Sequence, residues 1–385
     1  MNRKPVALFV ANEVGSFTNH RSHLVEVVQQ IGLQPVLMAS PVGEKRVSGL
    51  KVVPIKIYRF SFSLVSDALL VLRILCFLLE SRPRLVHLIN LKPYLYGGIA
   101  CQIARLLGWR GAVVFTVPGL GRIFARDACD TAASIRRKIV IRGLRFAARN
   151  ATVTFETAHD RDMWTSLQIV KSDNTCVTNG TGIDLQKYSQ RRRYTFNQHR
   201  PLRVLFASRL LKAKGLDVFL ESATLVDPRD VEMLVAGPIE DDPDAVDAEV
   251  LTHKGDFQYL GQVDDMPMLL ASVDVVVLPS RYNEGIPRIL IEAAAAGCVP
   301  IATIFPGSSM LIDHGETGFL LRRTLLKEQA VELRDLVLLL ARDTKLRCSM
   351  AYNAARKVTT TGFSAEHVAE DFKNLYVRAI NRCAS

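Results

Sequence analysis

Glu284 and Glu292 give the clearest chemical signal in the sequence. Glu284 follows an apolar run that ends at Leu278. Pro287 then suits the first turn of a helix that Gly297 would end. A helix N-terminus at the carboxyl end of a strand is a natural seat for phosphate. Beside a diphosphate, carboxylates are tolerated where they accept hydrogen bonds from ribose and sugar hydroxyls. The alternative for Glu284 is a favourable charge near the helix N-terminus.

Arg209 and Lys214 form a second candidate cluster, in a loop that directly follows the apolar run 203–207. Two cations at the carboxyl edge of a sheet could clamp a diphosphate and neutralise its growing charge as a sugar departs. Lys212, which stands between them, is interpreted as an ordinary solvated lysine. The pair alone would be a weak signal, because surface loops commonly carry basic residues.

Glycines in two loops of the first half are candidates for close contact with a ligand. Gly15 stands in a loop predicted after the first strand, where it could let the backbone approach a phosphate or a sugar. Gly119 and Gly121 follow the apolar run 112–116 and could equally be turn residues. Neither loop contains the G-x-G-x-x-G dinucleotide fingerprint. The histidines lack metal-ligand spacing, so no metal site is predicted.

Apolar runs separated by amphipathic stretches predict the elements that position these loops. Short runs rich in Val, Ile and Leu between helices are typical of parallel sheets in α/β layers. The expected buried strands are 5–10, 35–38, 85–88, 112–116 and 152–155, followed by 203–207, 232–236, 257–260, 273–278 and 299–303.

The two series of strands predict two domains. Residues 191–201 are polar, charged and without period, which indicates a linker. The predicted fold is α/β, with two Rossmann-like doubly wound domains, residues 1–190 and 202–365, that face a central cleft. Residues 366–385 are predicted as a C-terminal helix able to return to the first domain. Ligands of such sheets bind at the carboxyl ends of the strands.

The charge of the chain is uneven. The net charge is +11 over 385 residues; residues 1–190 carry 25 Lys and Arg against 12 Asp and Glu (+13), and residues 191–385 carry 24 against 26 (−2). Unless it is ordinary variation, this asymmetry indicates that the first half faces a membrane surface, a phosphorylated acceptor or nucleic acid. No nucleic-acid-binding module or basic–aromatic interleaving is present. The seven cysteines are scattered without a CxxC pair, which favours a reducing compartment.

Two segments are candidates for contact with a membrane. The run 64–79 is interrupted by Asp67 and Arg73 and falls short of the ~20 apolar residues of a spanning helix, so a buried or interfacial helix is expected. The segment 133–151 places basic residues on one helical face and Val140, Leu144 and Ala147 on the opposite one. That basic face is either solvated or turned to an anionic membrane; its members are Lys138, Arg142, Arg145 and Arg149.

These motifs resemble glycosyltransferase family 4, the retaining enzymes of GT-B fold. The family's E-x7-E motif matches Glu284 and Glu292, and its R-L-x-x-x-K-G motif matches residues 209–215. The Y-L-G-x-V phrase at 259–263 and the N-G-T-G-I-D phrase at 179–184 are also similar. In the first half, Asn19-His-Arg21 and the glycines at 119 and 121 resemble a subgroup that acts on polyprenyl-diphosphate-linked saccharides. Asn283 and the Ser-Ser-Met run at 308–310 depart from that subgroup.

The resemblance implies a hexosyltransferase that uses no cofactor and no metal ion. Its donor would be a UDP-sugar, carrying an N-acetylhexosamine or a hexose, and its acceptor a lipid-linked saccharide of bacterial polysaccharide or glycan biosynthesis. The enzyme would lie in the cytoplasm, peripherally on the inner face of the membrane, and bind no nucleic acid. The alternatives are a nucleotide-sugar epimerase of GT-B fold and a non-enzymatic nucleic-acid-binding protein.

Site residues are implied by the same resemblance. The catalytic set would be Arg209, Lys214 and Glu284, with the two cations on the diphosphate. Glu292 would bind the ribose. The remaining donor-binding residues would be Gly15, Gly285 and Ile286, and the acceptor-side candidates are Arg21, Gly119 and Gly121.

Overall fold

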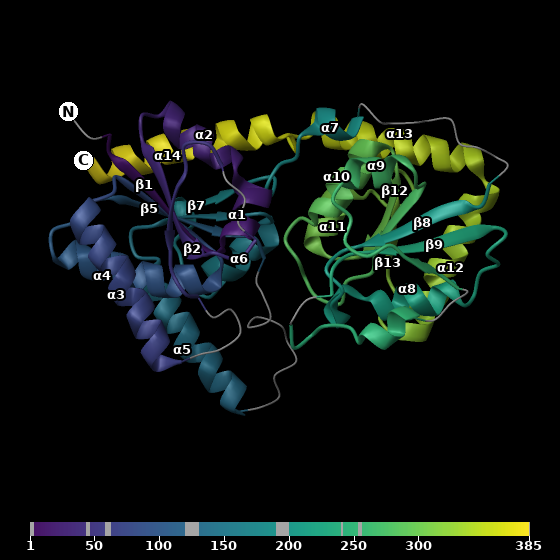
Figure 1. Cartoon of the computed structure of the whole chain (residues 1–385), viewed down its shortest axis with the longest axis horizontal. Helices are drawn as coiled ribbons and strands as arrows, with labels where there is room; N and C mark the ends of the chain where they lie inside the picture. The colour runs from purple at the N-terminus through teal and green to yellow at the C-terminus, as the bar shows by residue number, and fades with distance from the viewer. Residues whose placement is uncertain are drawn as a thin grey trace. The chain divides into compact units, whose positions relative to one another are not determined.

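The computed structural model describes residues 4–43, 47–57, 63–119, 131–189, 200–239, 242–252 and 256–384. The chain forms two compact units (Figure 1). Unit 1 comprises Met1–Thr181 and Glu366–Ser385, and unit 2 comprises Gly182–Ala365.

Unit 1 is built on a parallel sheet in the order β3-β2-β1-β4-β5-β6-β7. Its strands are β1 (Val6–Glu13), β2 (Gln34–Ser40), β3 (Lys51–Pro54), β4 (Leu85–Ile89), β5 (Ala112–Val117), β6 (Thr152–Phe155) and β7 (Thr175–Val177). The central strands are buried on both faces, which a parallel sheet requires because helices cover both sides. The order is that of a Rossmann sheet extended by one strand.

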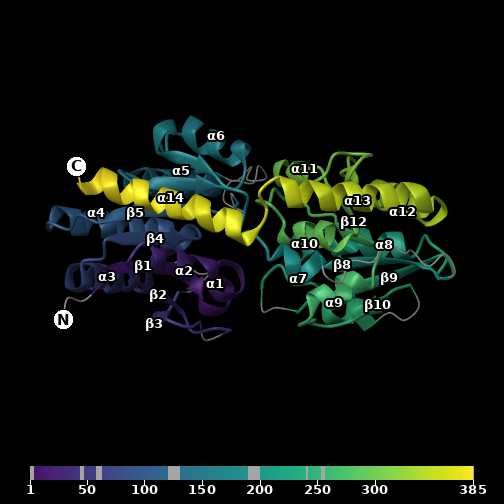
Figure 2. The same ribbon diagram turned by 90° about the horizontal axis from the view of Figure 1, so that it is seen from above.

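Two layers of helices cover this sheet (Figures 1 and 2). On one face, α3 (Leu64–Ser81), α4 (Gly98–Leu106) and α5 (Thr131–Ala147) share an apolar core with the strands. On the other face lie α1 (Val14–Arg21), α2 (His23–Gln30) and α14 (Ala365–Ala384). The short π-helix η1 (Pro93–Gly97) precedes α4, and α6 (Ala158–Ser166) follows β6. The C-terminal helix thus returns to the first unit, where Phe372 and Tyr376 are fully buried.

Unit 2 has a parallel sheet in the order β10-β9-β8-β11-β12-β13. Its strands are β8 (Leu202–Ala207), β9 (Val231–Ala236), β10 (Gln258–Tyr259), β11 (Val275–Leu278), β12 (Val299–Thr303) and β13 (Phe319–Leu321). Its α-helices are α7 (Leu185–Ser189), α8 (Leu216–Ala223), α9 (Met266–Ala271), α10 (Arg288–Ala296), α11 (Pro306–Leu311), α12 (Leu326–Arg342) and α13 (Thr344–Thr360). Apolar cores lie on both faces of this sheet as well.

The boundary between the units differs from the one predicted at 191–201. Ile183 and Tyr188 are buried in the core of unit 2, and the backbone of Ile183 exchanges hydrogen bonds with Phe363 (3.1 Å) and Ala365 (2.8 Å). The polar composition of 191–201 therefore does not mark the edge of the first unit. Most of that predicted linker, residues 191–199, lies outside the described residues.

The segment 64–79 folds as the helix α3, in agreement with the prediction of a buried or interfacial helix. Of the helices that the structure describes, none is both long and apolar enough to cross a bilayer. One face of α3 is buried and the other carries exposed leucines.

Candidate functional site

The carboxyl ends of β8 and β11 bring the two predicted loops together, because these strands are neighbours in the sheet. Gly215 has φ +76°, and a Cβ atom there would overlap the carbonyl oxygen of Pro279. Across the same contact, the Arg281 amide donates to the carbonyl of Ala213 at 2.9 Å. A side chain at Gly215 would therefore force apart the loops that carry Lys214 and Glu284.

Lys214 and Glu284 form an ion pair whose two side chains are 10% and 17% exposed. The Ser280 hydroxyl donates to the other oxygen of Glu284, and the Lys214 ammonium lies 5.4 Å from the ring centroid of Tyr282. Burial by itself would lower the pKa of Lys214, but the carboxylate of Glu284 together with Tyr282 outweighs burial and holds that pKa above its ordinary value. Lys214 is therefore a cation at neutral pH. An anion that binds to it would compete with Glu284.

Arg209 lies in the same loop as Lys214, and it is half-buried. The loop is pinned to the end of β9, because a Cβ atom at Gly237 would overlap the carbonyl oxygen of Ser208. It is also tied to Asp244, whose carbonyl accepts from the Lys212 amide at 2.8 Å. Arg209 therefore lies in a loop whose backbone has little freedom.

Glu292 occupies the middle of α10, with a side chain 10% exposed. Its Oε1 accepts two hydrogen bonds of 2.7 Å, from the Tyr188 hydroxyl and from Arg288 Nε. Burial, reinforced by the nearby carboxylate of Glu292, raises the pKa of Tyr188, so its hydroxyl stays protonated and donates. Tyr188 could not be linked to Glu292 from the sequence, because it lies about a hundred residues away in a segment predicted to belong to the other domain.

Gly285 and Ile286 are buried beside Glu284. Gly307, in the first turn of α11, approaches the carbonyl of Gly285 so closely that a Cβ atom would overlap it. A narrow hollow next to this contact is lined by Ser280, Tyr282, Glu284, Thr303 and Ser308. The loop before α10 is therefore fixed on one side by Gly215 and on the other by Gly307.

The segment that contains Gly15 is not the loop that the sequence suggested. Strand β1 continues to Glu13 and α1 begins at Val14, so Gly15 is a buried helical residue. A Cβ atom at Gly15 would lie 2.6 Å from the carbonyl oxygen of Gly43, and its amide donates to Val42 at 2.9 Å. Close packing against this turn is enough to require glycine, whether or not a ligand also approaches.

The other acceptor-side candidates lie at the carboxyl edge of unit 1. Arg21 pairs with Glu156 across 3.4 Å, and the side chains are only 5% and 4% exposed. The second terminal nitrogen of Arg21, Nη1, has no hydrogen-bond partner among the residues that the structure describes. Gly119 follows β5 with φ +150°, a conformation that favours glycine. Gly121 lies outside the described residues.

His87 lies buried near Arg21 and has a structural environment. One ring nitrogen is 2.7 Å from the Tyr376 hydroxyl and the other 2.6 Å from Thr116 Oγ1. Burial, and then the nearby Arg21 and His23, hold the pKa of His87 well below its usual range. The neutral ring connects α14 to the sheet, so His87 has a structural role.

The basic face predicted on 133–151 is present on α5. Leu144 and Ala147 are fully buried, whereas the four cations Lys138, Arg142, Arg145 and Arg149 are exposed. Two details differ from an ideal helical face. Arg149 follows the last helical residue, Ala147, and Arg145 donates to the carbonyl of Leu167 at 2.7 and 3.0 Å.

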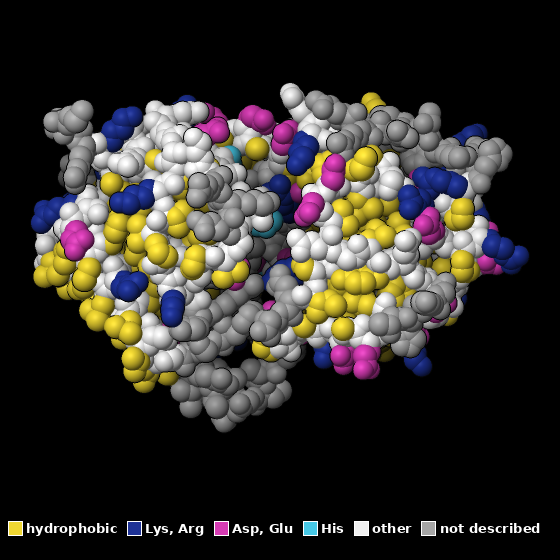
Figure 3. All heavy atoms as spheres, in the orientation of Figure 1, with side chains coloured by type: hydrophobic (Ala, Val, Ile, Leu, Met, Phe, Trp, Pro, Cys, Tyr) yellow, Lys and Arg dark blue, Asp and Glu magenta, His cyan; other side chains and the backbone are white. Residues whose placement is uncertain are grey.

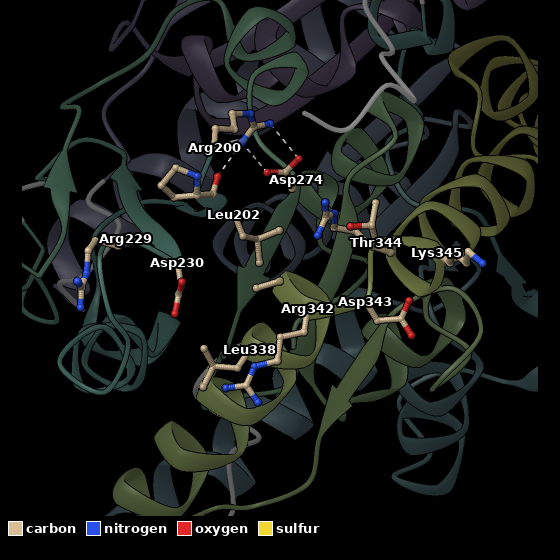
Figure 4. Close-up of a pocket in the computed structure, with 13 residues that line it drawn as sticks. Arg200, Leu202, Arg229, Asp230, Asp274, Leu338, Arg342, Asp343, Thr344 and Lys345 are labelled. Carbon is tan, nitrogen blue, oxygen red and sulfur yellow. Dashed lines mark hydrogen bonds and ion pairs between the residues drawn. The ribbon is translucent and has the colours of Figure 1, made fainter. Parts of the chain in front are cut away.

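A second hollow, of about 800 Å³, lies at the opposite edge of the unit 2 sheet (Figure 4). Arg200 and Asp274 form a two-pronged ion pair at its rim, with distances of 2.8 and 3.0 Å. Leu202, where β8 begins, and the start of α13 line it as well. It is remote from the loops of Lys214 and Glu284, which follow the other ends of the strands. In the described part of the chain, no group of three or more His, Cys, Asp or Glu could hold a metal ion.

Solved structures share the two-sheet fold that carries this site. Solved structures of the same fold include Anabaena HepE in complex with UDP-glucose, with a TM-score of 0.74, 18% identity, and coverage of 97% of this chain and 99% of that one. The sucrose-phosphate synthase of Thermosynechococcus elongatus has a TM-score of 0.77 at 17% identity and covers 99% and 100%. The predicted GT-B fold is confirmed.

Residues 201–343 match the family model described as "Glycosyl transferases group 1". This segment contains Arg209, Lys214, Glu284 and Glu292 with the strands that position them. The second unit therefore resembles the glycosyl transferases group 1 family in the segment that carries the predicted motifs.

Curated relatives are glycosyltransferases. The chain is 30% identical over 221 residues to the N,N'-diacetylbacillosaminyl-diphospho-undecaprenol alpha-1,3-N-acetylgalactosaminyltransferase of Campylobacter jejuni, covering 55% of this chain and 56% of that protein. It is 23% identical over 336 residues to the UDP-Gal:alpha-D-GlcNAc-diphosphoundecaprenol alpha-1,3-galactosyltransferase of Escherichia coli, covering 82% and 81%. The matched region thus spans about half the length of the first relative. Both relatives are named as glycosyltransferases and neither as an epimerase.

Proposed function

We propose that this chain is a retaining glycosyltransferase that moves a hexose or N-acetylhexosamine from a UDP-sugar to a lipid-linked saccharide in bacterial polysaccharide or glycan biosynthesis. The observation that carries the proposal is the buried Lys214–Glu284 pair at adjoining strand ends, within the segment that matches the family. The names of the Campylobacter and Escherichia relatives support the lipid-diphosphate acceptor.

Each residue then has a role that its environment supports. Lys214, held charged by Glu284, would exchange part of that contact for the donor diphosphate, and Arg209 would stabilise the charge that grows as the sugar leaves. Glu284 would accept hydrogen bonds from sugar hydroxyls. Glu292, oriented by Tyr188 and Arg288, would accept from the ribose. A leaving diphosphate oxygen could take the acceptor proton on the same face, so the residues need supply no separate base.

Nucleotide-sugar screening tests the proposal. Radiolabelled UDP-sugars are offered together with polyprenyl-diphosphate-linked saccharides, with and without EDTA, and the lipid fraction is analysed for retained anomeric configuration. We expect labelled lipid in the presence of EDTA. An altered sugar nucleotide formed without any acceptor would instead establish the epimerase, and activity that EDTA abolishes and Mg²⁺ or Mn²⁺ restores would refute the metal-free mechanism.

Substitution of Glu284 and of Glu292 should affect UDP affinity to different extents. Because Glu292 is assigned to the ribose and Glu284 to the sugar, Glu292→Ala should weaken the binding of bare UDP by about tenfold or more, while Glu284→Ala mostly spares it. Tyr188→Phe, which removes one donor to Glu292, should have a smaller effect of the same kind. Isothermal calorimetry with UDP measures all three, and the reverse order for the two glutamates would exchange their roles.

We further propose that the enzyme associates peripherally with the cytoplasmic face of the membrane through α5. A lipid-linked acceptor stays in the bilayer, so the enzyme must come to it. Each Lys or Arg near an anionic leaflet contributes about 1 kcal/mol, and four exposed cations lie on this face with no acidic residue in the helix. The excess charge of the first half supports the same surface.

Vesicle co-sedimentation measures this association. Changing Lys138, Arg142, Arg145 and Arg149 together to glutamine should lower binding to anionic vesicles at least tenfold, and added salt should weaken the wild-type protein. The matched control changes four exposed cations of unit 2, Arg322, Arg323, Arg342 and Lys345, to glutamine and should bind normally. Equal binding to neutral and anionic vesicles, or no binding at low salt, would rule out this surface.

A further inference from the structure

Helix α3 presents an apolar face to solvent. Its inner face, with Leu70, Ile74 and Leu78, is buried against the sheet, as in any amphipathic surface helix. The outer face should then be polar. It carries large apolar side chains instead: Leu64 is 92% exposed, Val65 72%, Leu69 56% and Leu72 53%. Figure 3 shows apolar side chains gathered on the part of unit 1 where Figure 1 places α3.

The exposed charges around this face are mostly positive. Helix α4 packs against both α3 and α5, so the three helices form one layer. The two acidic residues of α3 are Asp67 and Glu80. Asp67 is buried and bound to Lys92 (3.3 Å) and Tyr96 (2.7 Å), which leaves Glu80 as the exposed acid of the layer among the described side chains. The basic residues on the same layer include Arg73, Arg105, Lys138, Arg142 and Arg145.

We propose that the outer face of α3 inserts into the head-group region of an anionic bilayer while α5 binds the surface charge beside it. The inference rests on the proposed lipid-linked acceptor. A helix whose one face is apolar, on a surface that is otherwise basic, lies in the plane of the membrane with that face buried by roughly 5–10 Å. Burial of apolar side chains drives insertion and is not screened by salt. The electrostatic attraction between α5 and the anionic lipids is screened by salt. The two together supply the pair of signals that stable but reversible anchoring requires.

A bilayer fits this face better than a second copy of the chain. A symmetric dimer pairs the same surface of both copies, so the cations of α4 and α5 would be brought toward their own counterparts. An anionic lipid surface instead complements them. Apolar side chains on α3 with cations on the neighbouring helices are the composition expected of an interfacial helix rather than of a protein interface core.

Two native cysteines allow a direct test. Cys76 is exposed on α3, one turn after Leu72, and Cys383 is exposed on α14, which covers the other face of the sheet. An environment-sensitive fluorophore is attached to each in a variant that retains only that cysteine and gives a wild-type circular dichroism spectrum. On adding vesicles of phosphatidylglycerol and phosphatidylethanolamine, we expect a blue shift and quenching by brominated lipid for the probe at Cys76, and neither for the probe at Cys383. Bound protein with an unchanged probe at Cys76 would overturn the proposal.

Substitution of the apolar face gives the second test. Leu69→Ser with Leu72→Ser should leave thermal stability unchanged, because both side chains are already exposed, and should weaken vesicle binding about tenfold or more. The binding that survives high salt should be lost. Val331→Ser with Leu339→Ser, two exposed apolar residues of α12 in unit 2, is the matched control and should bind normally.

Activity measurements keep this inference separate from the proposed function. The α3 variant should turn over a water-soluble, short-chain acceptor like the wild type and lose activity only toward the same saccharide on a bilayer-borne lipid. If no acceptor is used at all, the function is wrong, while insertion is still decided by the Cys76 probe. A wild-type dimer in analytical ultracentrifugation that the α3 variant converts to monomers, with unchanged vesicle binding, would assign the face to a second copy and overturn insertion.

Discussion

Replacing Lys214 by alanine should lower turnover by roughly 10²–10³-fold, the usual effect of removing one charge partner of a transition state. Arg209→Ala should act on the same scale. Lys214 has a further consequence, since its removal leaves the Glu284 carboxylate, only 17% exposed, without its counter-charge beside the position proposed for the donor diphosphate. The loss should therefore appear both in turnover and in UDP affinity.

Matched variants separate this role from a general effect of charge. Lys212→Ala removes an exposed lysine of the same loop and should leave turnover near normal. Glu284→Ala combined with Lys214→Ala should restore part of the lost UDP affinity, because the repelling carboxylate is gone, while turnover stays low. Near-normal turnover of both Arg209→Ala and Lys214→Ala, in proteins with unchanged melting temperature, would remove the diphosphate-clamp assignment.

The meeting of Lys214 and Glu284 could be predicted from the sequence because parallel strands place their following loops at one edge. Apolar runs located β8 and β11, and the motifs located the loops after them. What the pattern could not reveal is that the two side chains form an ion pair with each other. Oppositely charged residues far apart in a chain pair only when the packing of both loops, here fixed by Gly215 and Gly307, brings them within reach.

Tyr188 and Gly15 were misplaced because their positions depend on contacts that are distant in the sequence. Tyr188 belongs to unit 2 because Ile183 pairs with the segment at 363–365, which no local pattern reveals. Gly15 is predicted in a loop that approaches a ligand, yet it lies in a helix, where it touches a turn almost thirty residues later. The strands β3, β7 and β13 lie at or near sheet edges and are only three or four residues long, too short for a periodic signal.

Glu156→Ala should destabilise unit 1 by about 3–5 kcal/mol. Arg21 and Glu156 are almost fully buried, so removing the carboxylate leaves a guanidinium without its counter-charge in a region of low dielectric. Within the described part of the chain, one terminal nitrogen of Arg21 already lacks a hydrogen-bond partner, which leaves little local compensation. No sequence pattern singles out Glu156, which directly follows β6. Only the fold places it opposite Arg21.

The two tryptophans of the chain make this effect measurable in the correct unit. Trp109 and Trp164 are both buried in unit 1, so urea unfolding followed by tryptophan emission reports on that unit alone. Glu26→Ala, an exposed glutamate on α2, should change the unfolding free energy by less than about 0.5 kcal/mol. The double variant Arg21→Met with Glu156→Leu removes both charges and should recover most of the loss, because apolar side chains of similar size replace a buried ion pair at little cost. If Glu156→Ala keeps wild-type stability but loses activity, Glu156 instead contacts the acceptor. Arg21 would then be available to bind the phosphate of that acceptor.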